Sequence, residues 1–374
     1  MPLTQLHGTV RPDWESLVRC ILRQGTPARV HFIELFLDSE VQDAVCQRFN
    51  LLEGLDPADP AYEWRRQVRI QRFLGYDYVR CGMEGMDMPL HRVIADDTAD
   101  LARAAGRQYI DEHRGPITSW DEFETYPWPD PAWRYTAVRG DPEAATTQAL
   151  EWYQANLPPD MCIVGSGGFA HFAEYLSWLM GYETLCFALR DQRELVRAIS
   201  ERLISIYRVV VTRLLQFDRV KIIWGSDDMG FRSGTLISPK DLREFVLPGH
   251  ALMAQLSHKA GRPYLLHACG KLDAIMPDLI DDVQIDARHS FEDTIETVVE
   301  AKARYGDRIA LLGGIDVDFL CRADEDAVRR RVRDTLERCQ PGGGYCLGTG
   351  NSVANYVPLD NYLAMLDEGR RYTG

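Results

Sequence analysis

The amino-acid sequence predicts an α/β protein, a single (β/α)8 or TIM barrel over residues 1–374, and three observations support that fold class. Short apolar segments alternate with longer amphipathic ones, which is the pattern of a parallel sheet covered by helices. Eight such strand–helix units can be counted, and that number favours a barrel over an open sheet. Ionisable side chains follow most of the apolar segments, as they do at the catalytic face of a barrel.

The predicted elements follow one another in a regular order. Each strand is a short apolar run, and each helix repeats its apolar residues with the helical period. The predicted strands are 29–36, 76–81, 161–165, 220–225, 263–268, 283–287, 309–314 and 344–348. The predicted helices between them include 39–50, 170–180, 193–216, 239–259, 293–305 and 325–338.

One long segment, 82–160, interrupts this order between the second and third strands. It is too long for a simple connection, and it contains predicted helical pieces at 97–105 and 144–156. Because insertions after a strand emerge at the catalytic face, the segment is predicted to form a lid or wall of the pocket. The alternative is a rigid structural excursion whose tryptophans pack for stability; these are Trp120, Trp128 and Trp133.

The composition excludes several classes of function. The net charge of −14 and a pI near 5.2 argue against binding to nucleic acid or to an anionic membrane. The N-terminal residues lack the pattern of a secretion signal, and no apolar run approaches the roughly 18 residues of a membrane span. The nine cysteines are scattered singly, as reduced thiols are. We therefore expect a cytoplasmic protein.

A histidine and a cysteine lie two residues apart at the end of the fifth predicted strand. Alternate residues of a strand point to the same face, so His267 and Cys269 are expected to project together. Imidazole nitrogen and thiolate sulfur are ligands that zinc prefers. The pair therefore predicts a zinc site, and the alternative is a pocket motif that binds no metal.

Further polar side chains are expected to meet them at the same mouth, because they follow the other predicted strands. Buried charges without a partner or a task are rare, so the group is a candidate active site. Its members are Glu34, Arg80, Asp228, His289, Asp316 and Asn351.

Individual members also have structural interpretations. Asp316 is placed to cap the helix that follows the seventh strand. Glu34 and Arg80 could simply pair with each other, and His289 could be a structural histidine.

Several motifs resemble the uroporphyrinogen decarboxylase superfamily. The resemblance covers the chain from about residue 28 to its C-terminus, and it implies a (β/α)8 barrel that is often dimeric. The motifs are HACG at 267–270, YGDRIALLGGID at 305–316, GYCLGTGNS at 344–352, PLDN at 358–361, and two further blocks at 74–78 and 225–239.

The resemblance implies one of two chemistries. One branch decarboxylates the acetate side chains of a tetrapyrrole without a cofactor. The other branch moves a methyl group from a corrinoid protein to a thiol such as coenzyme M, or to tetrahydrofolate. Thiol-accepting members hold zinc with an H-x-C pair and a later cysteine.

The chain departs from both branches. The arginine cluster and the catalytic aspartate of the decarboxylase are absent at the matching positions 33–37 and 79–82, so uroporphyrinogen is not the expected substrate. In the methyltransferases the later cysteine falls nearest Asn351. Cys346 lies five residues earlier and is the candidate third ligand.

Together, these features predict a homodimeric methyltransferase that works with a corrinoid protein and a thiol or pterin acceptor. His267 and Cys269 are the expected zinc ligands, and Glu34 is expected to be a displaceable ligand. Asp228, His289 and Asn351 are expected to orient the acceptor. The first alternative is a cofactor-free lyase acting on a small carboxylate or tetrapyrrole, with Asp228 and Arg80 at its centre. The second alternative is a barrel that only binds.

Overall fold

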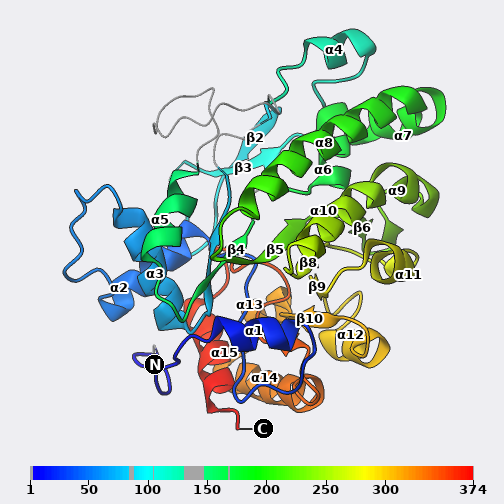
Figure 1. Cartoon of the computed structure of the whole chain (residues 1–374). Helices are drawn as coiled ribbons and strands as arrows, with labels where there is room; N and C mark the ends of the chain where they lie inside the picture. The colour runs from blue at the N-terminus through cyan, green and yellow to red at the C-terminus, as the bar shows by residue number, and fades with distance from the viewer. Residues whose placement is uncertain (1–2, 84–87, 104, 130–146, 167–168, 374) are drawn as a thin grey trace.

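A curved parallel sheet of seven strands forms the centre of the molecule (Figure 1). The computed structural model describes residues 3–83, 88–103, 105–129, 147–166 and 169–373. The strand order is β1-β4-β5-β8-β9-β10-β11, and every neighbouring pair is parallel. The strands are β1 (Tyr78–Cys81), β4 (Cys162–Gly165), β5 (Val220–Ser226), β8 (Tyr264–His267), β9 (Ala287–His289), β10 (Ala310–Leu312) and β11 (Tyr345–Cys346).

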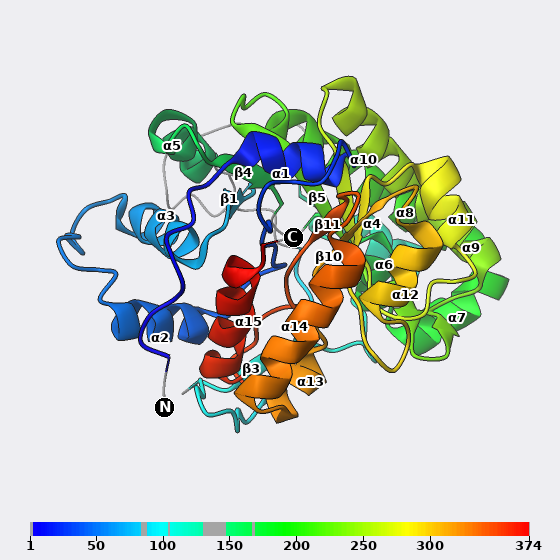
Figure 2. The same ribbon diagram turned by 90° about the horizontal axis from the view of Figure 1, so that it is seen from below.

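Helices surround this sheet (Figures 1 and 2). They are α1 (Trp14–Ile21), α2 (Ser39–Phe49), α3 (Tyr62–Leu74), α4 (Trp120–Thr125), α5 (Gln148–Asn156), α6 (Phe172–Met180), α7 (Tyr182–Asp191), α8 (Arg193–Leu214), α9 (Pro239–Phe245), α10 (Leu247–Lys259), α11 (Met276–Asp278), α12 (Val298–Tyr305), α13 (Val317–Arg322), α14 (Glu325–Cys339) and α15 (Leu359–Arg371). None of the helices in the described ranges combines the length and apolarity that crossing a bilayer requires.

The predicted first strand, 29–36, is not a strand. Its backbone bonds to the segment after β11, where Ile33 N donates to the Leu347 carbonyl at 2.9 Å. On its other side a side chain takes the place of a backbone ladder. Glu34 N donates to Tyr78 Oη at 2.9 Å, and the Tyr78 hydroxyl donates to the Glu34 carbonyl at 3.2 Å. The sheet therefore has seven strands instead of the predicted eight, and backbone ladders do not close it.

Two other predicted elements also differ. The sixth strand was predicted at 283–287, but it lies at Ala287–His289, because residues Leu279–Val283 form a π-helix. The predicted helix 239–259 divides into α9 and α10 at Val246. Pro248, which has no N–H to continue the first helix, stands in the first turn of the second.

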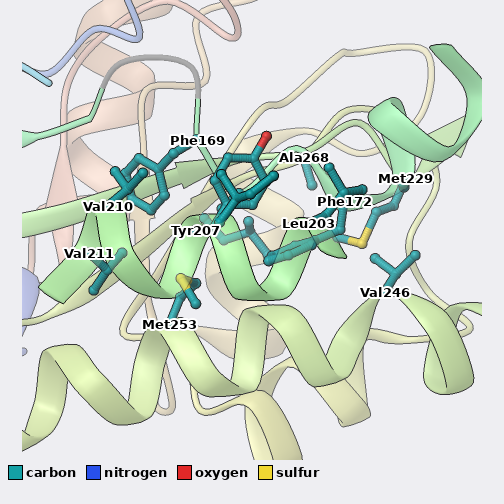
Figure 3. Packing of buried hydrophobic residues seen from close by; sticks show 14 of the residues in the cluster. Phe169, Phe172, Leu203, Tyr207, Val210, Val211, Met229, Val246, Met253 and Ala268 are labelled. Atoms are coloured by element: carbon teal, nitrogen blue, oxygen red, sulfur yellow. The ribbon is translucent and has the colours of Figure 1, made fainter. Parts of the chain in front are cut away.

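Strand alternation separates two packed layers. Trp224, Leu265 and Ala287 are register partners, so they share one face of the sheet. The opposite face packs against the helices, and Figure 3 shows Phe172 of α6 and Tyr207 of α8 packed near Met253 of α10. His267 lies two residues beyond Leu265 and on the same face as Leu265, at the carboxyl ends of the strands. We call that end the mouth and the opposite end the floor.

The described part of segment 82–160 contains a small hairpin, β2 (Arg92–Ala95) with β3 (Arg107–Ile110), followed by α4 and α5. A second hairpin, β6 (Gly230–Phe231) with β7 (Gly234–Thr235), follows β5. Of the predicted helix at 97–105, the described residues 97–103 form a turn instead, in which Asp97 accepts bonds from Ala99 N and Arg103 N. Trp128 packs against Phe123, whereas Trp133 lies outside the described residues.

Candidate metal centre

Three side chains with metal-ligand atoms converge at the mouth. His267 ends β8, Cys269 follows it on the same face, and Asp228 follows β5, whose Ser226 is the register partner of His267. Their ligand atoms all lie within 4.8 Å of one another. His267 Nε2 is 3.4 Å from both Cys269 Sγ and Asp228 Oδ1, and Cys269 N donates to Asp228 Oδ1 at 3.0 Å. The expected same-face projection of His267 and Cys269 is present, and Asp228 joins them.

The three groups differ in charge. Burial, with the nearby Asp228 carboxylate, raises the pKa of the Cys269 thiol well above its usual range. Burial also acts to raise the pKa of Asp228, but hydrogen bonding and charge from His267 outweigh it and lower that pKa to about 2. A carboxylate, an imidazole nitrogen and a sulfur atom therefore face one space, and a cation is the natural counterpart for such a set.

His289 supports His267 from behind. The two are register partners on β9 and β8, and their Nδ1 atoms lie 2.7 Å apart. Burial, with the neighbouring His267 and Arg80, lowers the pKa of His289 well below its usual range, so His289 is neutral. When His267 donates from Nδ1 to His289, its Nε2 lone pair is free to face Cys269 and Asp228. That tautomer is the one a metal ligand requires.

Two polar side chains contact the Cys269 sulfur. Asn351 Nδ2 donates to Sγ at 3.4 Å, and Ser290 Oγ lies 3.4 Å from it. Ser290 has a φ of 101°, a left-handed conformation that non-glycine residues rarely adopt. Both residues line a cavity of about 650 Å³ beside Cys269, which extends to Arg288 and Tyr356.

Glu34 is buried and Arg80 half-buried near the mouth, but each has its own partners. Thr349 N and Oγ1 bond to the Glu34 carboxyl at 2.8 and 2.5 Å, and burial raises its pKa to about 8. Arg80 Nε donates to Ser166 Oγ at 3.0 Å, its guanidinium lies over Trp224, and burial lowers its pKa to about 10. The two residues share the lining of a small cavity of about 60 Å³, but their hydrogen bonds go to Ser166 and Thr349 and not to each other. Neither belongs to the group of three.

Cys346 is not part of that group either. It is completely buried, and a hydrogen bond with Cys20 of α1 raises the pKa of its thiol. Because α1 lies at the floor, the sulfur of Cys346 faces away from His267 and Cys269. Asp316 accepts a bond from Phe319 N at 2.7 Å, which confirms its interpretation as the cap of α13, and it also lines the large cavity.

Sequence reasoning gave no role to Ser290 and Thr349, although both lie at predicted strand ends. The available signal was their position: Ser290 directly follows His289, and Thr349 lies two residues before Asn351. Neither the positive φ of Ser290 nor the pairing of Thr349 with a carboxyl 315 positions away can be deduced from local sequence.

The chain is similar to proteins named as methyltransferases and to proteins named as uroporphyrinogen decarboxylases. Over 135 residues it is 30% identical to a methylcobamide:CoM methyltransferase, MtaA, of Methanosarcina barkeri, a match that covers 36% of this chain and 37% of that protein. A methylated-thiol–coenzyme M methyltransferase of Methanosarcina mazei is 33% identical over 133 residues, 35% of this chain and 33% of the relative. A uroporphyrinogen decarboxylase of Cupriavidus necator is 34% identical over 79 residues, 20% of this chain and 22% of the relative.

The match therefore spans about a third of the two methyltransferases. Among solved structures, a methyltransferase from Methanosarcina mazei superposes with a TM-score of 0.65 at 16% identity and covers 98% of this chain and 99% of its own, which shows a shared fold. The sequence model of the family described as uroporphyrinogen decarboxylase (URO-D) matches residues 147–372. The chain belongs to the uroporphyrinogen decarboxylase family.

Proposed function

We propose that this protein is a zinc-dependent methyltransferase that moves a methyl group from a corrinoid protein to an acceptor thiol. The observation that carries the proposal is the convergence of Asp228, His267 and Cys269 at the mouth beside a cavity of about 650 Å³. The names of the two methyltransferase relatives support the same reaction class.

The donor set fits zinc. It offers one nitrogen, one sulfur and one oxygen atom, and three protein ligands leave a position for an exogenous ligand, as in catalytic zinc sites. Asp228 is the third member of the set in place of the expected Cys346, and Glu34 lies outside the set. Zinc bound there would lower the pKa of an acceptor thiol, so that the acceptor reacts as its thiolate.

The protein's own residues would orient this reaction. His289 holds His267 in the required tautomer, and Asn351 and Ser290 fix the Cys269 sulfur by hydrogen bonds. The acceptor would occupy the cavity next to Cys269. Its sulfur would then attack the methyl carbon in line, so that an S–C bond forms while the Co–C bonding pair stays on the cobalt of the partner.

Several finer points remain predictions. They are a pterin in place of the thiol, a homodimer, a cytoplasmic location, a lid formed by segment 82–160, and an eight-unit barrel in which segment 29–36 occupies the first position.

The test is methyl transfer from methylcobalamin to 2-mercaptoethanol and to 2-mercaptoethanesulfonate by the zinc-loaded protein. We expect thiol-dependent loss of methylcobalamin absorbance, and at least about a hundredfold loss of rate in Cys269→Ala. Cys186→Ala, which removes an exposed cysteine on α7, is the matched control and should keep the wild-type rate. A rate unchanged in Cys269→Ala would contradict the proposal.

The lyase alternative makes the opposite forecast. It requires that chelation leave activity intact and that Asp228→Asn abolish turnover while Cys269→Ala does not. We expect no carbon dioxide from uroporphyrinogen incubated with the protein. Efficient release would instead place the chain with the decarboxylases that share its family.

A further inference from the structure

We infer that the floor of the sheet carries a second, serine-based site, Ser16–His31–Asp77, able to cleave small esters by acyl transfer. Ser16 lies on α1, His31 lies in the extended segment 29–36, and Asp77 directly precedes β1. His31 Nε2 lies 3.0 Å from Ser16 Oγ, and His31 Nδ1 lies 2.7 Å from Asp77 Oδ2. A nucleophile, a base and an orienting carboxylate are thus linked in one line, as in serine hydrolases on unrelated folds.

The carboxylate fixes the proton on the correct nitrogen of the imidazole. Asp77 can only accept at Oδ2, so neutral His31 carries its proton on Nδ1. Its Nε2 lone pair then faces Ser16 Oγ, which donates to it. His31 is therefore held as the general base that a serine nucleophile needs.

The Asp77 charge is compensated inside the protein. Asp77 and His31 are both completely buried. Asp13 N donates to Asp77 Oδ1 at 2.6 Å, and the Arg29 guanidinium forms an ion pair with the same oxygen. These contacts hold the carboxylate in place at Oδ1 and leave Oδ2 to orient His31.

A cavity gives access to the serine. It has a volume of about 560 Å³ and shares no lining residue with the cavity at the mouth. Ser16 lies on its wall with Trp14 and Arg29, and Pro12, Ala28 and Pro159 add apolar surface. Ser16 belongs to the first turn of α1, where its N–H donates to the capping side chain of Asp13 and its hydroxyl remains available to a molecule in the cavity. These features fit a short acyl ester.

The chemistry needs only the ester and water. Ser16 Oγ forms a bond to the acyl carbon while its proton passes to His31 Nε2. The C–O bond to the alcohol breaks, and the alcohol leaves with that proton. Water then attacks the acyl-serine with His31 again as base, which releases the acid and restores Ser16.

The test is covalent labelling of the full-length protein with a fluorophosphonate probe, followed by peptide mass spectrometry. We expect an adduct on Ser16, with none at that peptide in Ser16→Ala. His31→Asn should lower the labelling rate by about a hundredfold. Ser39→Ala, which removes an exposed serine at the start of α2, is the control and should label as the wild type does.

Hydrolysis of p-nitrophenyl acetate is the second measurement. Ser16→Ala serves as its blank, because the background reaction of the ester at surface groups is the same in this variant and in the wild type. The expected result is a rate in the wild type at least about tenfold above that of Ser16→Ala. Failure of the probe to modify Ser16, or equal rates in the two proteins, would overturn the inference. The Ser16 results decide the matter even if His31→Asn does not fold. Methyl transfer at the mouth is an independent activity and should survive in Ser16→Ala.

Discussion

The two ends of the sheet each hold a buried histidine, but the surroundings of the two histidines differ. At the floor, His31 lies between Ser16 and Asp77, and Arg29 balances the charge of that carboxylate. At the mouth, the described residues give Asp228 an ion pair with His267 alone, and a cysteine sulfur faces the same space.

The difference separates a complete network from an incomplete one. Both carboxylate oxygens of Asp77 accept hydrogen bonds from groups of the protein, so the network at the floor needs no ligand to be complete. The mouth instead gathers a nitrogen, a sulfur and an oxygen atom that can each bind a metal ion, an arrangement that an added metal ion would complete. Stability should therefore depend on protein groups at the floor and on a ligand at the mouth.

The largest expected effect concerns Glu34, a buried carboxyl near the mouth that forms no ion pair within the described part of the chain. Its pKa is raised to about 8, so protonated Glu34 contributes stability at low pH. That contribution is fully present below about pH 4.5, where the unfolded carboxyl titrates, and is lost as pH rises to 8. We expect the free energy of unfolding to fall by about 4 kcal/mol more in the wild type than in Glu34→Gln between pH 5 and 8.

Urea denaturation across that pH range measures this difference. Glu53→Gln, at an exposed position, should follow the wild type. Parallel pH profiles for the wild type and Glu34→Gln would show that the carboxyl is ionised in the folded protein.

A direct contrast between the ends comes from Asp77→Asn and Asp228→Asn in chelator-treated protein. Removing the Asp77 charge leaves Arg29 and His31 without their partner, which should cost about 3 kcal/mol of folding free energy. Asp228 is partly exposed, so its replacement should change stability by less than about 1 kcal/mol. Urea denaturation measures the free energy of unfolding of both variants. Equal losses would contradict the claim that the floor depends on protein partners and the mouth on a ligand.

The smallest effect tests the backbone at Ser290. Glycine adopts a φ of 101° more readily, so Ser290→Gly should gain about 1 kcal/mol of stability, whereas Ser290→Ala keeps the strained backbone and should not. Thermal unfolding of the two variants gives the comparison. Both variants lose the hydroxyl beside Cys269, so a similar fall in metal affinity in both would assign that effect to Oγ.

The sequence predicts the mouth better than the floor, for a physical reason. Strand alternation is local, so the joint projection of His267 and Cys269 can be predicted from two adjacent positions. Their proximity to Asp228 follows from the rule that parallel strands end at one edge. The position of the Cys346 side chain depends on how α1 packs at the floor. Its hydrogen-bond partner, Cys20, is far from it in the sequence, so local patterns do not predict the contact.

The departures in the fold have a similar origin. Segment 29–36 has the apolar composition of a strand, yet the Tyr78 hydroxyl takes the backbone groups of Glu34 that a ladder would use. The Ser16–His31–Asp77 line joins residues with no common motif, because contacts 15 and 46 positions apart create it. Such contacts depend on the folded backbone and leave no periodic pattern in the sequence.

The most direct test of the central claim is zinc content together with X-ray absorption at the zinc edge. The account predicts about one zinc per chain, with a sulfur ligand near 2.3 Å and nitrogen or oxygen ligands near 2.0–2.1 Å. The metal should be lost in Cys269→Ala and retained in both Cys346→Ala and Cys186→Ala. Protein that holds no zinc after reconstitution, or that loses it in Cys346→Ala but keeps it in Cys269→Ala, would contradict the account.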